Sequence, residues 1–466
     1  MADISQFATQ IKGDVVTEKD ADYMKAIARW AANAQRNAKV VVFVKDEDDI
    51  AATIKYAKDN ALPIAIRGGG HNPAGASSTD GGVVIDLSRY LNGTKVDAEK
   101  KLAYVGGGAL WETVDKAAIE HGLATVGGTV NHTGVAGLLL GGGYGWLSAA
   151  HGLVIDNLVQ ATLVTADGSS ITASETENAD LFFGIRGGGC NFGVATEFVL
   201  KLYLQRRTVY SGVMVFAPPA LEKLVAVTKE WFSHAGQHEG MIQIATVGPD
   251  GNPAVVAFPF YNGTEAEGRN AFRAFLDIGP VADMTKEIPY EELNALQNPQ
   301  VHHGNGVYMK GVAHKNINFQ LISKAFDKVI EIAKGTGLRP AILYEYFPLS
   351  EVTSVSASKT AFRRDPASSI LVILAWDGDV PDKSDQARSL AYEIAGIVTG
   401  GQSEAINTES LGYSNYDPEG VSGGMEAVTD KAKLVFGDNY PKLQEIKKKY
   451  DPKNIFNKWF PITPAV

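Results

Sequence analysis

The sequence predicts an α+β protein built from two domains. The chain has 466 residues, which is more than one hydrophobic core usually holds. Short apolar runs of strand length alternate with amphipathic helical segments, and the connections between them are short. All four glycine triplets lie before residue 190, beginning at Gly68, Gly106, Gly141 and Gly187. The change in composition near Arg206 therefore predicts a domain boundary close to residue 205.

Local patterns predict the elements of the first half. Val40 to Val44 is an apolar run of strand length, and the acidic residues Asp46 to Asp49 favour the start of a helix directly after it. Pro63 to Arg67 and Val83 to Leu87 read as further short strands. Leu102 to Val105 is another strand, and it leads through a glycine turn into an amphipathic helix.

That helix carries Leu110, Val114 and Ala117 on its apolar face. In the second half, Pro219 to His234 and Ile322 to Lys334 are long amphipathic segments. They lie between strand-like runs, and the chain therefore continues as a second α+β domain. Those runs include Val255 to Phe260 and Ile370 to Trp376. The segment from Phe436 to Phe460 begins as a helix.

Composition excludes several classes of function. The net charge of −10 and the absence of a basic block argue against a nucleic-acid partner. Cys190 is the only cysteine, which rules out an intramolecular disulfide and a redox pair. No basic stretch followed by an apolar one opens the chain, and no apolar run is long enough for a bilayer. We expect a cytoplasmic protein without a membrane partner, and secretion stays open if a signal peptide was removed.

The run Arg67-Gly68-Gly69-Gly70-His71-Asn72 is the main candidate site. Glycines let a large ligand approach the backbone, and a neutral imidazole nitrogen beside it is a nucleophile. This combination predicts a tethered cofactor, although a histidine in such a loop is often only hydrogen bonded. The segment that follows, Asn72 to Asp80, is rich in Gly, Ser and Pro and predicts a loop. A dinucleotide-binding fold of the Rossmann type needs a helix there, so we expect turn amides to bind phosphate.

Three segments together resemble the FAD-linked oxidases of the vanillyl-alcohol oxidase/p-cresol methylhydroxylase (PCMH) superfamily. They are residues 38 to 202, Tyr413-Ser414-Asn415-Tyr416, and the C-terminal run from Tyr450 to Phe456. The chain is most similar to the berberine bridge enzyme-like branch, which includes oligosaccharide oxidases. The resemblance implies a two-domain α+β protein. One domain has the PCMH-type FAD-binding fold, and the substrate domain contains an antiparallel sheet covered by helices. We place the FAD-binding domain at 1–205, the substrate domain at 206–417, and a returning C-terminal segment at 418–466.

The resemblance implies FAD bonded through its 8α-methyl group to His71. The residues that it assigns to the cofactor are Arg67, Gly68, Gly69, Gly70, His71, Asn72, Gly75, Gly128, Thr129, Thr133, Gly134, Gly137, Gly142, Gly143, Tyr144, Gly145, Gly193, Val194 and Tyr416. Many relatives attach the flavin a second time through a cysteine, and that position is Val130 here. We therefore expect attachment through His71 only. Cys190 stands where relatives usually have glycine, and we interpret it as a small buried residue.

The implied reaction transfers a hydride from an alcohol carbon to FAD, and dioxygen then reoxidises the flavin and gives hydrogen peroxide. The resemblance favours Tyr413 as the base, on a strand that also brings Asn415 into the site. A tyrosine with a pKa near 10 needs a lowered pKa for this role, from a nearby cation or from hydrogen bonds, and Arg363 or Arg364 could supply the cation. His132 is the second candidate for the base.

Several alternatives stay open. Tyr344, Glu345 and Tyr346 are further candidates for the base, whereas the run from Ile370 to Trp376 is apolar and offers none. Thr133 stands where a small residue admits oxygen in relatives, which favours an oxidase over a dehydrogenase with another acceptor. A flavin-carrying binding protein without turnover is the third possibility. The expected partners are dioxygen and a small molecule, either an oligosaccharide or a secondary-metabolite alcohol, with a monomer or homodimer as the assembly.

His302 and His303 resemble a metal pair. Adjacent residues of an extended chain point to opposite sides, and no acidic residue is spaced nearby. We therefore predict no metal site and interpret both residues as surface or cleft lining.

Overall fold

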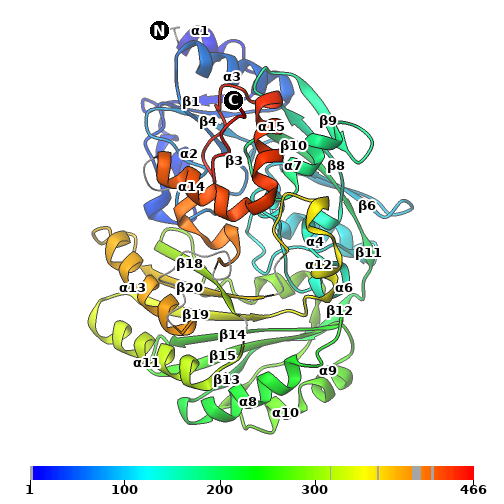
Figure 1. Ribbon diagram of the computed structural model, residues 1–466, viewed down its shortest axis with the longest axis vertical. Helices are drawn as coiled ribbons and strands as arrows, with labels where there is room; N and C mark the ends of the chain where they lie inside the picture. The colour runs from blue at the N-terminus through cyan, green and yellow to red at the C-terminus, as the bar shows by residue number, and fades with distance from the viewer. Residues whose placement is uncertain (1–3, 315, 365–366, 401–410, 421–424) are drawn as a thin grey trace.

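The computed structural model describes residues 4–314, 316–364, 367–400, 411–420 and 425–466. Figure 1 shows two parts of the chain lying against each other. The upper part contains the N-terminal half together with the C-terminal helices, and the lower part contains a large antiparallel sheet. The predicted α+β class is confirmed. Within the described residues, none of the helices combines the length and the apolar character needed to cross a membrane.

The strands of the upper part are β1 (Asp14–Val16), β2 (Val40–Phe43), β3 (Ile64–Arg67), β4 (Val83–Asp86), β5 (Thr94–Asp97), β6 (Leu102–Gly106), β7 (Leu123–Ala124), β8 (Leu158–Val164), β9 (Ser170–Ser174), β10 (Val194–Lys201) and β11 (Tyr203–Leu204). Its helices are α1 (Ile4–Ala8), α2 (Tyr23–Ile27), α3 (Glu47–Asp59), α4 (Trp111–Ile119), α5 (Val135–Leu140), α6 (Ser148–His151), α7 (Ala179–Ile185), α14 (Met425–Phe436) and α15 (Tyr440–Tyr450).

Two sheets form the framework of the upper part. The first has the order β1-β2-β4-β3, in which β2, β4 and β3 run parallel and β1 runs antiparallel to β2. Its central strands are fully buried, as continuous apolar runs predict. The predicted helix after Val44 is α3, and Asp46 accepts a hydrogen bond from the backbone N of Asp49 at its start. The second sheet is antiparallel, in the order β5-β6-β10-β8-β9.

A buried lysine anchors the C-terminal segment to the rest of the upper part. Nζ of Lys447, in α15, lies 2.7 Å from Oδ2 of Asp451, and neither side chain is exposed to solvent. The same Nζ donates to the carbonyl oxygens of Asn191 and Phe456, both at 2.6 Å. The carboxylate of Asp451 also accepts hydrogen bonds from the backbone N of Ile455 and Phe456. These contacts fix the C-terminal run against the segment that precedes β10.

The strands of the lower part are β12 (Thr208–Ser211), β13 (Met214–Phe216), β14 (Glu239–Val247), β15 (Pro253–Tyr261), β16 (Ala282–Asp283), β17 (Lys286–Pro289), β18 (Gly306–His314), β19 (Arg339–Tyr346) and β20 (Ser368–Trp376). The helices between them are α8 (Leu221–Phe232), α9 (Glu265–Ala271), α10 (Arg273–Leu276), α11 (Phe319–Gly335) and α12 (Ser350–Ser354), and α13 (Ser384–Val398) follows the last strand.

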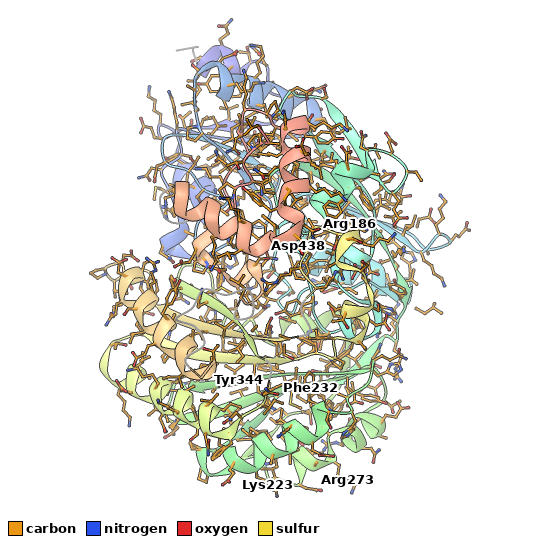
Figure 2. All side chains as sticks on the ribbon, viewed as in Figure 1. Arg186, Lys223, Phe232, Arg273, Tyr344 and Asp438 are labelled. Atoms are coloured by element: carbon orange, nitrogen blue, oxygen red, sulfur yellow. The ribbon has the colours of Figure 1, made fainter. Side chains whose placement is uncertain are left out.

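These strands form one sheet whose main path is β16-β13-β15-β14-β19-β20-β18. Helices α11 and α13 pack on the sheet, and Figure 1 shows α8, α10 and α11 on the side away from the upper part. Side chains alternate between the two faces of a strand. Tyr344 and Tyr346 of β19 therefore lie in the apolar core under the helices, near Phe232 of α8 (Figure 2). Glu345, between them, lies on the opposite face.

Three local predictions are corrected by the structure. Tyr413-Ser414-Asn415-Tyr416 is not a strand, because residues 414 to 416 form the short 3-10 helix η6 (Ser414–Tyr416). The predicted C-terminal helix corresponds to α15, which begins at Tyr440 and not at Phe436, because Phe436 ends α14 and Gly437 has a φ of 48° that breaks the regular helix. In α4 the buried face contains Trp111, Val114 and Ala118, whereas Leu110 precedes the helix.

Candidate active site

A cavity with about 1820 Å³ of empty space, part of it open to solvent, lies between the two parts of the molecule. Its lining includes residues of both parts, so a ligand bound there would contact both. Its wall on the upper part consists largely of glycine turns. Its wall on the lower part combines apolar and polar side chains. The apolar ones come from the large sheet, namely Val307, Met309, Leu343, Leu371, Ile373 and Ala375, and the polar ones are Gln297, Gln300, His302, Asn305 and Glu345.

The Gly68 to Gly70 turn follows β3 and packs directly against a second glycine turn. A Cβ atom on Gly69 would lie 2.6 Å from the backbone of Gly134, and one on Gly134 would lie 2.5 Å from Gly69. Asn72 fixes the rest of the loop, because its Oδ1 accepts hydrogen bonds from the backbone N of Ala74 and Ala76. Only glycine permits the close contact between the two turns at Gly69 and Gly134. The cavity wall there is therefore backbone without side chains.

His71 is held in the cavity wall by two aromatic neighbours. Its ring stacks on Trp30, with ring centroids 4.1 Å apart, and its Nε2 lies 3.2 Å from Nδ1 of His132. Burial, together with the nearby His132 and His303, lowers the pKa of His71 to about 3. The ring is therefore neutral at physiological pH, and a neutral imidazole carries the lone pair that nucleophilic attack requires.

Most of the predicted cofactor residues line this cavity. Those that line it are Gly68, Gly69, Gly70, His71, Asn72, Gly128, Thr129, Thr133, Gly134, Gly137, Tyr144, Gly193 and Tyr416. The others lie behind the wall, namely Arg67, Gly75, Gly142, Gly143, Gly145 and Val194. Arg67 pairs with Asp86, whose Oδ2 lies 2.8 Å from Nη1. A Cβ on Gly142 would approach the ring of Phe362 to 2.6 Å, which explains that glycine by packing.

The cavity wall fits an FAD molecule. Oγ of Ser77 is buried at this wall and has no hydrogen-bond partner among the described residues, as expected for a hydroxyl that serves a ligand. A Cβ on Gly137 would meet no atom within 4 Å, so this glycine faces open space in the cavity. These features suit a long ligand that carries phosphate groups. They are the glycine turns without side chains, the hydroxyl of Ser77 without a protein partner, and the neutral imidazole of His71.

Glu345 is a buried carboxylate in the wall of this cavity. Its side chain is 3% exposed, and Tyr416 donates a hydrogen bond to its Oε1 at 3.0 Å. The hydroxyl of Tyr144 donates to the other oxygen, Oε2. Burial raises the pKa of Glu345 to about 7, although the two tyrosine hydroxyls oppose that shift. A carboxylate that titrates near neutral pH is suited to accept a proton from a substrate.

The surroundings of the Tyr413 hydroxyl differ from those that the sequence predicts. Its hydroxyl oxygen accepts hydrogen bonds from the backbone N of Gly143 at 2.9 Å and from Nδ2 of Asn415 at 2.6 Å. Burial raises the pKa of Tyr413, so the prediction of a lowered pKa is wrong. Arg364, one of the expected cations, forms a two-point ion pair with Asp156. Tyr413 and Asn415 do line the cavity.

The remaining candidates divide between the cavity and the surrounding structure. Val130 and His302 line the cavity, and the ring of His132 lies 4.9 Å from the ring of His303. Cys190 also lines the cavity and is partly exposed, so its interpretation as a small buried residue is corrected. Its surroundings raise the pKa of the thiol by burial, which disfavours the thiolate.

Two tryptophans of the cavity wall were missed by the sequence analysis. Trp30 lies 41 positions before His71 and belongs to no motif, so no local signal marks it. Trp459 covers Gly189 so closely that a Cβ there would lie 2.1 Å from the indole ring.

A second cavity, with about 910 Å³ of empty space that is partly open to solvent, adjoins the first. Tyr144, Glu345 and Tyr413 line both cavities, so these three side chains form the partition between them. The second cavity is mostly apolar, with Phe347 and Phe362 among its lining residues. Glu345 can therefore be approached from two sides.

The fold and the cavity define a two-domain flavoprotein with the chemistry of an oxidoreductase. Residues 38–174 match the family described as "FAD binding domain", and residues 412–462 match "Berberine and berberine like". The chain is 32% identical to the FAD-linked oxidoreductase pgmH of Aspergillus terreus over 99% of this chain and 96% of that protein. The chain belongs to the berberine bridge enzyme-like family of FAD-linked oxidoreductases.

Further relatives agree with this assignment. The chain is 30% identical to (R)-6-hydroxynicotine oxidase of Paenarthrobacter nicotinovorans, over 99% of each chain. The crystal structure of 6-hydroxy-D-nicotine oxidase from Arthrobacter nicotinovorans matches with a TM-score of 0.85 and 27% identity, over 98% of each chain. Xylooligosaccharide oxidase from Myceliophthora thermophila shares the fold, with a TM-score of 0.84 and 22% identity over the whole of both chains.

Proposed function

We propose that this FAD-linked oxidoreductase is an oxidase that carries its cofactor on His71 and uses Glu345 as the catalytic base. The observation that carries the proposal is that one cavity is lined by both groups, a neutral buried imidazole in a glycine turn and a buried carboxylate. Bound FAD supplies a two-electron acceptor for a hydride. Val130 offers no sulfur for a second bond, which supports attachment through His71 alone.

In this proposal Glu345 acts as a carboxylate. It accepts the proton from a hydroxyl or amine group of the substrate while the adjacent carbon is oxidised. Tyr144 and Tyr416 hold the carboxylate in place through their hydroxyl hydrogens. Tyr413 has a structural role in this proposal, because its hydroxyl oxygen accepts hydrogen bonds from the backbone N of Gly143 and from Asn415. Glu345 therefore replaces Tyr413 as our first candidate for the base.

The wall of the cavity favours an apolar substrate. Six apolar side chains of β18, β19 and β20 line the cavity beside Glu345, and none of them offers a hydrogen bond. Hydroxyl groups of an oligosaccharide that lay against these six side chains would remain unpaired, and unpaired buried polar groups are costly. We therefore favour a compact aromatic or aliphatic secondary metabolite with one oxidisable group.

Two carbon types are candidates for oxidation. The first is an alcohol carbon, as the resemblance implies. The second is an amine carbon, because a relative at 30% identity is named for hydroxynicotine, which is an amine. Thr133 lines the cavity with a small side chain, which supports access for dioxygen as the electron acceptor.

The proposal is tested on the purified full chain. We expect a yellow protein whose colour stays with the acid-precipitated polypeptide and whose intact mass contains one FAD. Under nitrogen, apolar aromatic alcohols or cyclic amines should bleach the flavin, whereas cellobiose should not, and air should restore the colour with release of hydrogen peroxide. A colourless protein, or bleaching by cellobiose alone, contradicts the proposal. Bleaching that air does not reverse identifies a dehydrogenase.

A further inference from the structure

Three histidines form a row that begins at the cavity wall and ends at the protein surface. Nε2 of His71 lies 3.2 Å from Nδ1 of His132, and the two ring centroids are 5.1 Å apart. The ring of His132 lies 4.9 Å from that of His303, whose side chain is exposed. His71 and His132 come from two glycine-rich loops of the upper part, whereas His303 precedes β18 of the large sheet. The row therefore crosses the boundary between the two parts.

The row is not a metal site. Among the described residues, no three His, Cys, Asp or Glu side chains are arranged to hold a metal ion. The direct contact between His71 and His132 instead has the length of a hydrogen bond between two imidazoles. In a pair of neutral imidazoles, one ring donates its hydrogen and the other accepts it.

This contact decides which nitrogen of His71 is free. Because Nε2 faces His132, Nδ1 is the nitrogen left to attack a ligand in the cavity. Forming a bond through Nδ1 leaves the ring cationic until the hydrogen on Nε2 departs. A cation at this position is unfavourable, since burial already lowers the pKa of His71 to about 3. Formation of the bond therefore requires a proton acceptor beside Nε2.

His132 is that acceptor by position. Burial lowers the pKa of His132 and nearby His303 lowers it further, but a hydrogen bond with the backbone carbonyl of Val301 opposes these effects. This carbonyl supports the protonated ring, and His303 beyond it is in contact with solvent. A proton on His132 therefore has a short path out of the protein.

We propose that His132 accepts the proton from Nε2 of His71 as Nδ1 of His71 bonds to the 8α carbon of FAD, and that His303 passes this proton to solvent. The inference rests on the proposed attachment through His71. One C–H bond of the 8α-methyl group and one N–H bond of His71 break, and one C–N bond forms. The two electrons remain on the flavin and pass to dioxygen, which takes up two protons and becomes hydrogen peroxide.

The test compares attachment of FAD in the full-length wild type and in His132→Gln. We expect the variant to purify yellow, which shows an intact cleft, but to release its FAD on acid precipitation. With added FAD in air, covalent attachment should be about 10²-fold slower than in the wild type, the usual effect of losing an acid–base group. His303→Gln should slow attachment by a smaller factor. The control His121→Gln, at the end of α4 and outside the row, should attach FAD at the wild-type rate.

Chemical rescue separates a proton acceptor from a structural residue. In His132→Ala, added imidazole should accelerate covalent attachment, which a packing defect would not allow. Attachment at the wild-type rate in His132→Gln, or no response of His132→Ala to imidazole, overturns the role of His132. Release of all FAD by the wild type itself has a different meaning, because it overturns the proposed attachment and this inference together.

Discussion

Tyr416 donates its hydroxyl hydrogen to Oε1 of Glu345 across a distance of 3.0 Å. The bond joins η6, near the C-terminal end of the chain, to β19 in the middle of the large sheet. Tyr144 of the upper part donates to the second oxygen of the same carboxylate. Glu345 is therefore a carboxylate of the lower part that is oriented by two tyrosines from other segments, and this arrangement yields the first three predictions.

Replacing Glu345 by Gln should lower turnover by about 10² to 10⁴-fold, because an amide cannot accept the substrate proton. FAD binding should persist, since the variant keeps the shape of the side chain. Turnover is measured as hydrogen peroxide release, and FAD content from the visible absorption. Asp115→Asn is the matched control, because Asp115 is a buried carboxylate bonded to Asn294 outside the cavity. Equal turnover in Glu345→Gln and the wild type would remove Glu345 from the mechanism.

The pH dependence of the reaction should report the pKa of Glu345. A base acts in its deprotonated form, and burial raises the pKa of this carboxyl to about 7. We therefore expect kcat/KM to rise about tenfold per pH unit below this value and to level off above it. Steady-state rates between pH 5 and pH 9 test this on a stable substrate. A profile that is flat through pH 7 would contradict the assignment.

Tyr416 in η6 and Tyr413 directly before η6 should respond differently to removal of the hydroxyl group. Tyr416→Phe removes a donor that lowers the pKa of Glu345, so the inflection of kcat/KM should move to higher pH. Tyr413→Phe removes the acceptor for Gly143 and Asn415. It should cost about 1 to 3 kcal/mol of unfolding free energy and leave the inflection in place. An inflection shifted by Tyr413→Phe instead would restore Tyr413 as the base.

Lys447→Met should destabilise the protein strongly. The substitution leaves Asp451 charged and buried, and it removes the donor to the carbonyls of Asn191 and Phe456. Loss of one partner of a buried ion pair costs about 3 to 5 kcal/mol, which denaturant unfolding measures. Lys448→Met is the control, since the neighbouring Lys448 is exposed and should change stability by less than about 0.5 kcal/mol. A small effect at Lys447 would show that the pair is dispensable.

The sequence was sufficient for elements whose causes are local. Strand β2 and helix α3 follow from an apolar run and from Asp46 at the helix start, and both lie where they were predicted. The glycine turn before His71 was equally clear, because its sequence excludes a helix. These features depend on residues that are close in the sequence, so the sequence alone was enough to predict them.

Other features depend on packing between distant segments. The conformation of η6 is set by close contacts of Asn415 with Gly141 and of Tyr416 with Gly311, which no local pattern reveals. Alternation along β19 separates Glu345 from its two neighbouring tyrosines, but only the position of the helices decides which face meets the cavity. The choice of Tyr413 as the base therefore followed the motif, whereas the three-dimensional arrangement favours Glu345.

The return of the C-terminal segment has a consequence for biosynthesis. Trp459 completes the cofactor cavity, and Lys447 anchors its segment to the carbonyl of Asn191. A ribosome-bound chain that lacks these residues lacks part of the cavity wall. The complete cavity can therefore form only after synthesis has passed residue 459.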